Sequence, residues 1–326
     1  MRRGTWRIGI LAAIALGVAL PARADEKAKD RAKDKKEIAW AKSYEEAVKA
    51  ARAANKPIMI DFYTVWCGPC RMLESETYTD GKVIAASEKF VSLKLDAEKE
   101  GEHLAKMLEV QAYPTILFLD PQTAGKDGGD VVGKILGFEK GGPFTEKMNT
   151  IEAAFRRFPA TEQAYEKDPS DPKALARLVN AYVERGNPDA ARKLLDEGEK
   201  RDPEDKQGRL ARLSNAVADA YKSKGQEAIQ LGDVDKGVAL LDKAIALFRK
   251  AATIGKDPSD VFHARYQAAL CYYGQDKYKE SFKELEAAQK VEGVSADRKR
   301  KGAAMLQRLK DSLKQQGIDP EDKEGI

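Results

Sequence analysis

A change of pattern near residue 160 limits what this chain of 326 residues can fold into. Before it, short apolar runs of strand length alternate with stretches that suit helices. After it, strand candidates are absent and alanine becomes frequent. A chain of this length has room for two domains of the usual size, about 100 to 200 residues each. The sequence therefore predicts an α/β domain followed by an all-helical domain.

Four apolar runs in the first part predict the strands of a mixed sheet. They occupy residues 58–63, 90–96, 115–119 and 131–136. Helices are expected at residues 43–55, from Cys67 and Cys70 onward, at 101–108 and at 143–158. Alternating strands and helices that end in a hairpin indicate a sheet with helices on both faces.

From residue 160 to about residue 316, the chain carries a repeat of about 34 residues. One copy runs from Leu175 to Pro203, a looser copy centres on Gly232, and a third runs from Ala268 to Ala288. Small residues fall where two helices of a unit cross, and larger ones fill the seam between units. This pattern resembles tetratricopeptide (TPR) repeats, and residues 317–326 are expected to form a polar tail.

The first 24 residues have the features of a secretory signal peptide. Three arginines precede an uncharged apolar run, and residues 22–24 provide a small-x-small cleavage pattern. The run is shorter than the roughly 20 residues that cross a bilayer, so membrane attachment is expected only if the signal remains uncleaved. We expect a periplasmic or otherwise extracytoplasmic protein, in which the charged segment 25–37 is a solvated linker.

The basic charge of the chain belongs to this signal. Removing residues 1–24 removes four arginines and no acid, so the net charge falls from +4 to 0. A nucleic-acid-binding protein needs a basic face or stripe, so the balanced remainder predicts no nucleic-acid partner.

Two of the three cysteines, Cys67 and Cys70, stand directly behind Trp66. A zinc site usually needs four ligands, and the third cysteine and two histidines are scattered over both domains, so no metal is predicted. A purely structural bridge across so small a loop would add little stability. No cofactor is predicted either, and a redox-active dithiol is the favoured interpretation.

The expected position of the pair, between a buried strand and a helix, gives the two cysteines different roles. Cys67 would lie at a helix N-terminus, where free N–H groups and the helix dipole stabilise a thiolate, so it is the predicted nucleophile. Cys70, one turn further in and less exposed, is the predicted resolving cysteine. Gly68 and Pro69 allow a tight turn and begin the helix without requiring an N–H group.

Residues 58–71 resemble the active-site segment of the thioredoxin superfamily, and residues 112–116 resemble its cis-proline segment. The resemblance covers about residues 38–158 and is closest to extracytoplasmic thioredoxin-like domains. Some of these domains pass electrons to periplasmic disulfide proteins. It implies a thioredoxin fold and thiol-disulfide oxidoreductase activity.

The resemblance also implies a proton relay. Asp61 matches the buried acid that moves a proton on or off Cys70; the alternative is a half-exposed acid at a strand end. Thioredoxins carry a lysine near this acid. At the corresponding position this chain is expected to have Ser92, and Lys94, two residues further along the same strand face, is the candidate to replace the lysine.

Substrate contacts are expected around the pair. Pro114, if cis, would hold backbone beside Cys67 for an incoming peptide strand. Trp66 would shield the site, with a role in the core alone as the alternative. The residues expected to contact substrate are Trp66, Gly68, Pro69, Tyr113 and Pro114.

Two functions of different classes remain open. The first is an exported protein-disulfide reductase whose repeats dock disulfide-bearing clients or another protein partner. The Gly-Pro dipeptide resembles that of reducing thioredoxins, near about −270 mV, with isomerase or oxidase as alternative directions. A reductase would need an electron-donor protein in trans. The second is a cell-envelope scaffold, in which the repeats bind and the thioredoxin-like domain is a platform of low turnover.

Three further residues with reactive side chains receive structural roles. His103 and His263 have no nucleophile nearby in sequence and are expected on the surface or in packing. Cys271 is expected to be a small buried hydrophobic residue of a repeat helix, with a third redox thiol as the alternative.

Overall fold

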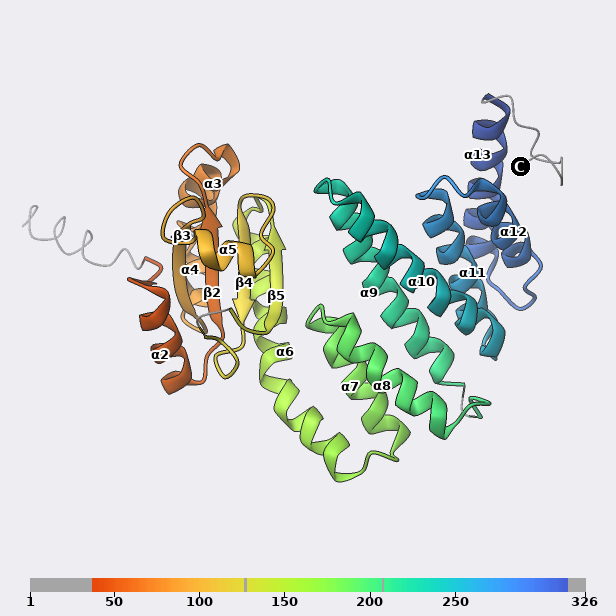
Figure 1. The fold of residues 1–326 in the computed structure, drawn as a ribbon, viewed down its shortest axis with the longest axis horizontal. Helices are drawn as coiled ribbons and strands as arrows, with labels where there is room; N and C mark the ends of the chain where they lie inside the picture. The colour runs from red at the N-terminus through yellow and green to blue at the C-terminus, as the bar shows by residue number, and fades with distance from the viewer. Residues whose placement is uncertain (1–36, 126–127, 207, 316–326) are drawn as a thin grey trace, which may run out of the picture. The chain divides into compact units, whose positions relative to one another are not determined.

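The computed structural model describes residues 37–125, 128–206 and 208–315 (Figure 1). The signal peptide, nearly all of the charged linker and the polar tail lie outside these residues. The described chain comprises an α/β part followed by a part built from helices, which confirms the predicted fold class. Among the described helices, none combines the length and apolarity needed to cross a membrane.

Five strands form one mixed sheet in the order β1-β3-β2-β4-β5. They are β1 (Trp40–Ala41), β2 (Ile58–Tyr63), β3 (Val91–Asp96), β4 (Thr115–Leu119) and β5 (Val131–Leu136). β3 pairs in parallel with β1 and β2, while β4 is antiparallel to both β2 and β5. The four predicted strands are present, and the two-residue β1 is too short to show an alternating pattern.

The helices of this part are α2 (Tyr44–Ala54), α3 (Gly68–Met72), the π-helical η1 (Leu73–Thr77), α4 (Gly81–Ser87), α5 (Glu102–Met107) and α6 (Gly141–Lys167). Ser43 caps α2 as expected, accepting a hydrogen bond from the Glu46 N–H. The helix expected to end at Phe158 instead continues through Pro159 to Lys167. Burial of Phe158 and Tyr165 in an apolar core supports this continuation at the cost of one helical hydrogen bond.

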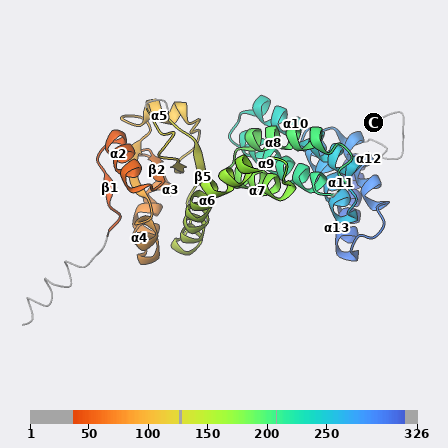
Figure 2. The same ribbon diagram turned by 90° about the horizontal axis from the view of Figure 1, so that it is seen from below.

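The side chains of β2 alternate between two cores on the two faces of the sheet. Ile58, Ile60 and Phe62 lie in a core with residues of α2 and α5, whereas Met59 lies in a core with residues of η1, α4 and α6 (Figure 2). Because successive side chains of a strand point to opposite faces, Asp61 shares the face of Met59. The acid therefore lies on the face covered by the helical segment that follows the cysteines.

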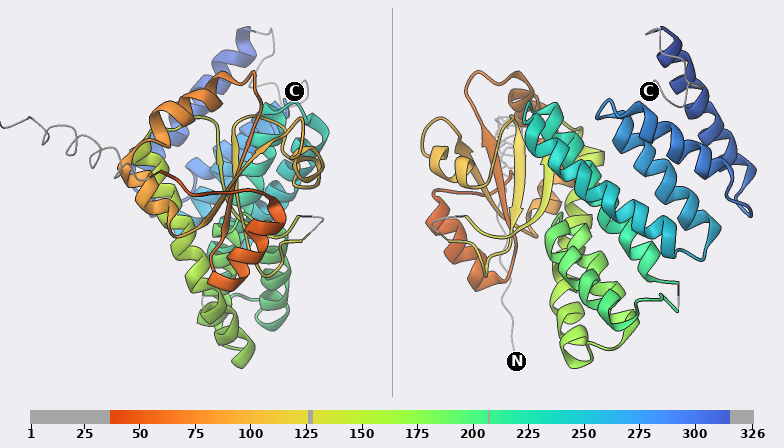
Figure 3. Two further views of the ribbon diagram at one scale, coloured as in Figure 1. Left: turned by 90° about the vertical axis from the view of Figure 1, so that its left-hand side faces the viewer. Right: turned by 45° about the vertical axis from the view of Figure 1, so that its right-hand side comes forward.

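The second part consists of α7 (Pro172–Glu184), α8 (Pro188–Arg201), α9 (Leu210–Gln230), α10 (Val234–Ile254), α11 (Pro258–Tyr273), α12 (Tyr278–Gln289) and α13 (Ala296–Gln315). Consecutive helices pack against each other along the chain (Figure 3). The three predicted repeat copies fall on the pairs α7–α8, α9–α10 and α11–α12.

Glycines allow the two longest repeat helices to approach closely. A Cβ atom on Gly225 of α9 would lie 2.9 Å from the carbonyl oxygen of Gly237 in α10, and one on Gly237 would lie 2.8 Å from the carbonyl oxygen of Gly225. Real Cβ atoms do not approach backbone this closely, so a side chain at either position would separate the helices.

Replacing Gly225 by alanine should therefore destabilise the repeat part, by about 1–3 kcal/mol, because the added methyl group overpacks the crossing. The matched control is Gly142→Ala in the first turn of α6, where the added methyl group would have no atom within 4 Å and alanine favours the helix by up to about 1 kcal/mol. Urea unfolding followed by circular dichroism measures both variants. Equal stability of the two variants would contradict the close-crossing explanation.

Candidate active site

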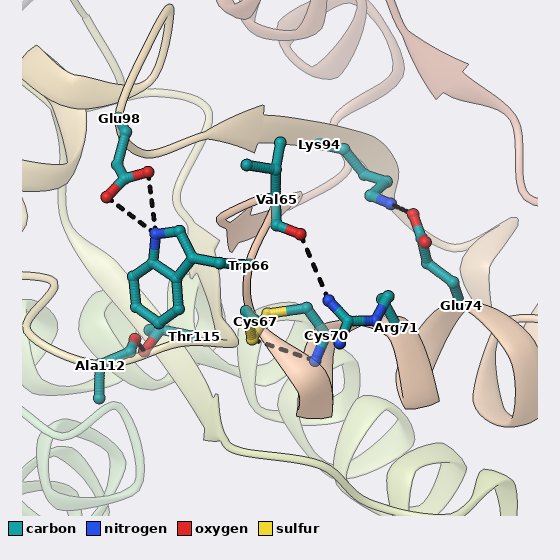
Figure 4. Close-up of a disulfide and its surroundings, with 10 residues drawn as sticks. All are labelled: Val65, Trp66, Cys67, Cys70, Arg71, Glu74, Lys94, Glu98, Ala112 and Thr115. Atoms are coloured by element: carbon teal, nitrogen blue, oxygen red, sulfur yellow. Dashed lines mark hydrogen bonds and ion pairs between the residues drawn. A yellow bond between two sulfur atoms is a disulfide. The ribbon is translucent and has the colours of Figure 1, made fainter.

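Cys67 and Cys70 form a disulfide where β2 gives way to α3 (Figure 4). Cys67 is the N-cap of α3, in extended conformation, and its Sγ accepts a hydrogen bond of 3.1 Å from the backbone N–H of Cys70. Pro69 lies in the first turn, where the N–H group that it lacks would have no helical partner. An N–H group of the first helical turn thus points at the sulfur of Cys67.

The two cysteines are almost equally buried. Their exposed fractions are 3% for Cys67 and 4% for Cys70, which differs from the expectation that Cys70 would be less exposed. The two sulfurs are bonded to each other in a disulfide. Hydrogen bonding at the helix N-terminus, rather than exposure, distinguishes the two sulfurs.

Trp66 lies on the surface beside the disulfide. It is 62% exposed, its Nε1 donates to both carboxylate oxygens of Glu98 at 3.0 Å, and its ring packs edge-on against Tyr113 at 6.0 Å between centroids. A role in the core alone is therefore excluded. Val65 and Met72, 62% and 41% exposed, extend the apolar surface around the cysteines.

The chain that precedes β4 supplies Tyr113 and Pro114. The peptide bond between them is cis. The loop is fixed by hydrogen bonds from Thr115 Oγ1 to the carbonyl oxygen of Ala112, at 2.7 Å, and from the N–H of Gly137 to the carbonyl oxygen of Pro114, at 2.9 Å. Tyr113 thereby meets the indole of Trp66, so two of the expected substrate-contacting residues lie together.

Asp61 is buried in the sheet, with 2% of its surface exposed, and is not a half-exposed strand-end acid. Burial raises the pKa of its carboxyl group to about 6, against the lowering effects of Lys94 and the Tyr78 hydroxyl, while Glu74 adds to the rise. A carboxyl group with such a pKa can accept or release a proton near neutral pH.

Of the two residues considered near Asp61, Ser92 and Lys94, Lys94 is the one that stands beside the acid. In the parallel pairing of β2 with β3, Lys94 stands directly opposite Asp61, whereas Ser92 stands opposite Met59. The Lys94 ammonium group forms an ion pair with Glu74 and lies 4.7 Å above the Tyr63 ring centroid. Because Glu74 shares the ammonium group, Lys94 does not cancel the effect of burial on Asp61.

Three residues of this site were not anticipated from the sequence: Glu74, Tyr78 and Glu98. Glu74 follows Cys70 by four residues, so helical spacing alone could have placed it near Cys70. Tyr78 directly follows the π-helical turn η1, and its hydroxyl influences the pKa of Asp61. Glu98 gives no sequence signal of its contact with Trp66.

The remaining reactive side chains lie outside this arrangement. Cys271 is buried in α11, and burial raises the pKa of its thiol to about 12, so it stays protonated. His263 forms a 2.8 Å contact with Asp219 in the repeats, and His103 is exposed on α5. No group of three or more potential metal ligands occurs within the described parts of the chain.

Replacing Asp61 by asparagine should remove a pH-dependent cost of folding. The pKa of Asp61 is raised from 3.8 to about 6, so the protonated form favours folding below about pH 4 and this advantage is lost as the pH rises to about 6. The free energy of unfolding of Asp61→Asn should then be about 3 kcal/mol higher than that of the wild type near pH 7. Near pH 4 the two values should be similar. Urea unfolding at both pH values measures this, and a difference that stays constant with pH would contradict the raised pKa.

Thiol labelling should separate the three cysteines. After reduction of the native protein at neutral pH, iodoacetamide should modify Cys67 first, because the Cys70 N–H group stabilises its thiolate. Cys271 should react only after unfolding in urea. Mass spectrometry of peptides from timed samples gives the order, and native labelling of Cys271 or faster labelling of Cys70 would contradict these assignments.

Comparisons with known proteins agree with this arrangement. Residues 39–121 match the family model described as thioredoxin-like, and residues 158–213 match that of the tetratricopeptide repeat. The thiol:disulfide interchange protein DsbD of Ralstonia nicotianae is 34% identical over 37% of this chain and 18% of its own length. The mitochondrial thioredoxin-3 of Saccharomyces cerevisiae is 39% identical over 26% of this chain and 57% of its own.

A solution structure of a thioredoxin from Thermus thermophilus, 23% identical, covers 37% of this chain and 92% of that one, with a TM-score of 0.33. The chain spans less than a fifth of the length of the DsbD protein that it matches. It carries a thioredoxin-like domain followed by tetratricopeptide repeats.

Proposed function

We propose that this protein is a thiol-disulfide oxidoreductase that reduces disulfides of client proteins through Cys67 and Cys70. The observation that carries the proposal is the placement of Cys67 Sγ at the start of α3, where it accepts the Cys70 N–H. Relatives whose names describe thiol:disulfide interchange and thioredoxin activity support it.

The reaction would begin with the reduced pair. The Cys67 thiolate attacks one sulfur of a client disulfide, forms a mixed disulfide and releases the other client sulfur as a thiolate, which takes up a proton. Cys70 then loses its proton and attacks Cys67 Sγ, which re-forms the Cys67–Cys70 disulfide and releases the second client thiol. Two electrons pass to the client, and a dithiol electron-donor protein must return two to the pair.

Asp61 would accept the proton of Cys70 in the second step. Its carboxyl group is buried on the sheet face covered by the segment after the cysteines, and its pKa of about 6 suits proton transfer near neutral pH. Asp61 would return that proton when the donor protein reduces the disulfide again.

Trp66, Val65 and Met72 would receive the client. Exposed apolar side chains gain from being covered, and the edge-on contact with Tyr113 together with the Glu98 hydrogen bonds holds the indole in one orientation. A client backbone would lie along the Tyr113–Pro114 segment, with Gly68 and Pro69 leaving room above the disulfide.

The reducing direction rests on the Gly68-Pro69 dipeptide, which resembles that of reducing thioredoxins. The N-terminal signal features favour an extracytoplasmic location, where disulfides persist and clients are available. The tetratricopeptide repeats would bind a protein partner or the client itself, since stacked helical repeats form extended binding surfaces.

Insulin reduction tests the activity. The chain from residue 25 onward should accelerate precipitation of insulin chains by dithiothreitol, while Cys67→Ser should reduce the rate to that of dithiothreitol alone. Cys271→Ser is the matched control, because it removes a buried thiol outside the site and should retain the wild-type rate. Loss of activity in the control but not in Cys67→Ser would overturn the assignment.

The alternative is a scaffold in which the thioredoxin-like domain has low turnover. In that case the intact chain would fail to accelerate insulin reduction at any dithiothreitol concentration, although it folds and binds partners.

A further inference from the structure

A buried donor and a buried acceptor on one face of the sheet both lack a hydrogen-bond partner within the described residues. They are the hydroxyl group of Tyr78 and Oδ1 of Asp61. Asp61 shares the face of Met59, and Tyr78 lies in the core on that face. Tyr78 is 8% exposed and Asp61 2%. Because folded proteins rarely leave such groups unpaired, the two together point to a role in the chemistry of the site.

Packing holds the Tyr78 side chain in this core. Its backbone N–H donates to the carbonyl oxygen of Leu73 at 2.8 Å. Its ring packs edge-on against Trp40 and Phe144, with centroid distances of 5.3 and 5.9 Å. The hydroxyl lies close enough to the Asp61 carboxyl group to lower the pKa of that acid. The two neighbouring rings therefore limit how far the hydroxyl can move from the acid.

The charged side chains that act on Asp61 are Lys94 and Glu74. Lys94 stands opposite the acid on β3, and Glu74 of η1 forms an ion pair with that lysine (Figure 4). On β4 the residue opposite Asp61 is Ile116, and α4 and α6 supply apolar side chains to this core. Since Glu74 engages Lys94, the Tyr78 hydroxyl is a donor for which no other described group competes.

We propose that Tyr78 is a positioning residue for the proton-transfer step, in which its hydroxyl donates a hydrogen bond to the ionised carboxylate of Asp61. The inference rests on the proposed function, since it assigns a further residue to the same site. A hydrogen bond to the charged form favours that form, so Tyr78 helps a buried acid to ionise near neutral pH. The carboxylate then takes the thiol proton of Cys70 as its sulfur bonds to Cys67 and the client thiolate leaves.

The Tyr78 hydroxyl keeps its own proton throughout this step. Burial raises the pKa of Tyr78 well above its ordinary value, and the neighbouring Asp61 carboxyl group raises it further. Tyr78 therefore donates a hydrogen bond and does not supply a proton. Without the hydroxyl, Asp61 would hold its proton to a higher pH, and a smaller fraction of it could accept the proton of Cys70 near pH 7.

Titration of Asp61 by nuclear magnetic resonance tests the proposal. The probe is the ¹³C-labelled side-chain carboxyl signal of aspartate in the disulfide form of the chain from residue 25 onward, and Asp61→Asn identifies the signal. Tyr78→Phe keeps the ring contacts with Trp40 and Phe144 and removes the hydroxyl. The midpoint of the Asp61 titration should rise by about one pH unit. An unchanged or lower midpoint would overturn the proposal.

Tyr165→Phe is the matched control. Tyr165 is also 8% exposed, and its hydroxyl donates to the Glu197 carboxylate at 2.9 Å in a different apolar core. This variant should leave the midpoint of Asp61 unchanged. An equal rise in both variants would mean that loss of any buried hydroxyl has this effect, and the role of Tyr78 would be refuted.

A second measurement follows the resolving step itself. Ellman's reagent converts reduced Cys67 to a mixed disulfide, and attack by Cys70 then releases a coloured thiolate. Near pH 6 this release should be about fivefold slower in Tyr78→Phe than in the wild type, because less Asp61 is ionised, and near pH 8 the rates should agree. A deficit of equal size at both pH values would contradict a role in proton transfer.

The titration requires no thiol chemistry, so the two proposals fail separately. If Tyr78→Phe raises the Asp61 midpoint but the wild-type chain does not reduce insulin, only the proposed activity is contradicted. If the wild-type chain reduces insulin but the midpoint is unchanged in Tyr78→Phe, only the role of Tyr78 is contradicted.

Discussion

The junction between β2 and α3 is the constraint on which the rest of the site depends. The strand ends, the chain turns through residues 64–66, and the helix begins at Cys67, so a backbone N–H group of the first turn is directed at the Cys67 sulfur. The same strand carries Asp61 six positions earlier, on the sheet face whose core includes Leu73 of η1, directly after α3. One strand and one turn thus position Cys67, Cys70 and Asp61, the residues to which the proposed mechanism assigns attack, resolution and proton transfer.

Burial of Asp61 costs folding free energy at neutral pH, but it also raises the pKa of the acid into the range that suits proton transfer. A carboxyl group inside an apolar core costs folding free energy once it ionises, and an apolar or amide side chain would avoid that cost. Lys94 stands opposite it but also pairs with Glu74, so the acid is only partly compensated and its pKa stays near neutral pH. A fully compensated Asp61 would stay ionised and could not take up a proton near pH 7.

Features that depend on local sequence pattern could be predicted from the sequence. Features that depend on strand pairing or on tertiary contacts could not. The four longer strands, the capped α2 and the repeat helices follow from apolar spacing, turn residues and small residues at crossings. The choice between Ser92 and Lys94 depended on the register of β2 against β3, which spacing within one strand does not reveal. Likewise, α6 passes through Pro159 because Phe158 and Tyr165 are buried, a tertiary effect that outweighs the local signal to stop.

Attack by Cys67 and resolution by Cys70 are tested most directly by trapping. The chain with Cys70→Ser should accumulate mixed disulfides with oxidised extracytoplasmic proteins, and mass spectrometry should place every bond on Cys67. The chain with Cys67→Ser should accumulate none. Adducts on Cys70 in the Cys67→Ser chain, at a level equal to those on Cys67, would contradict the roles assigned to the two cysteines.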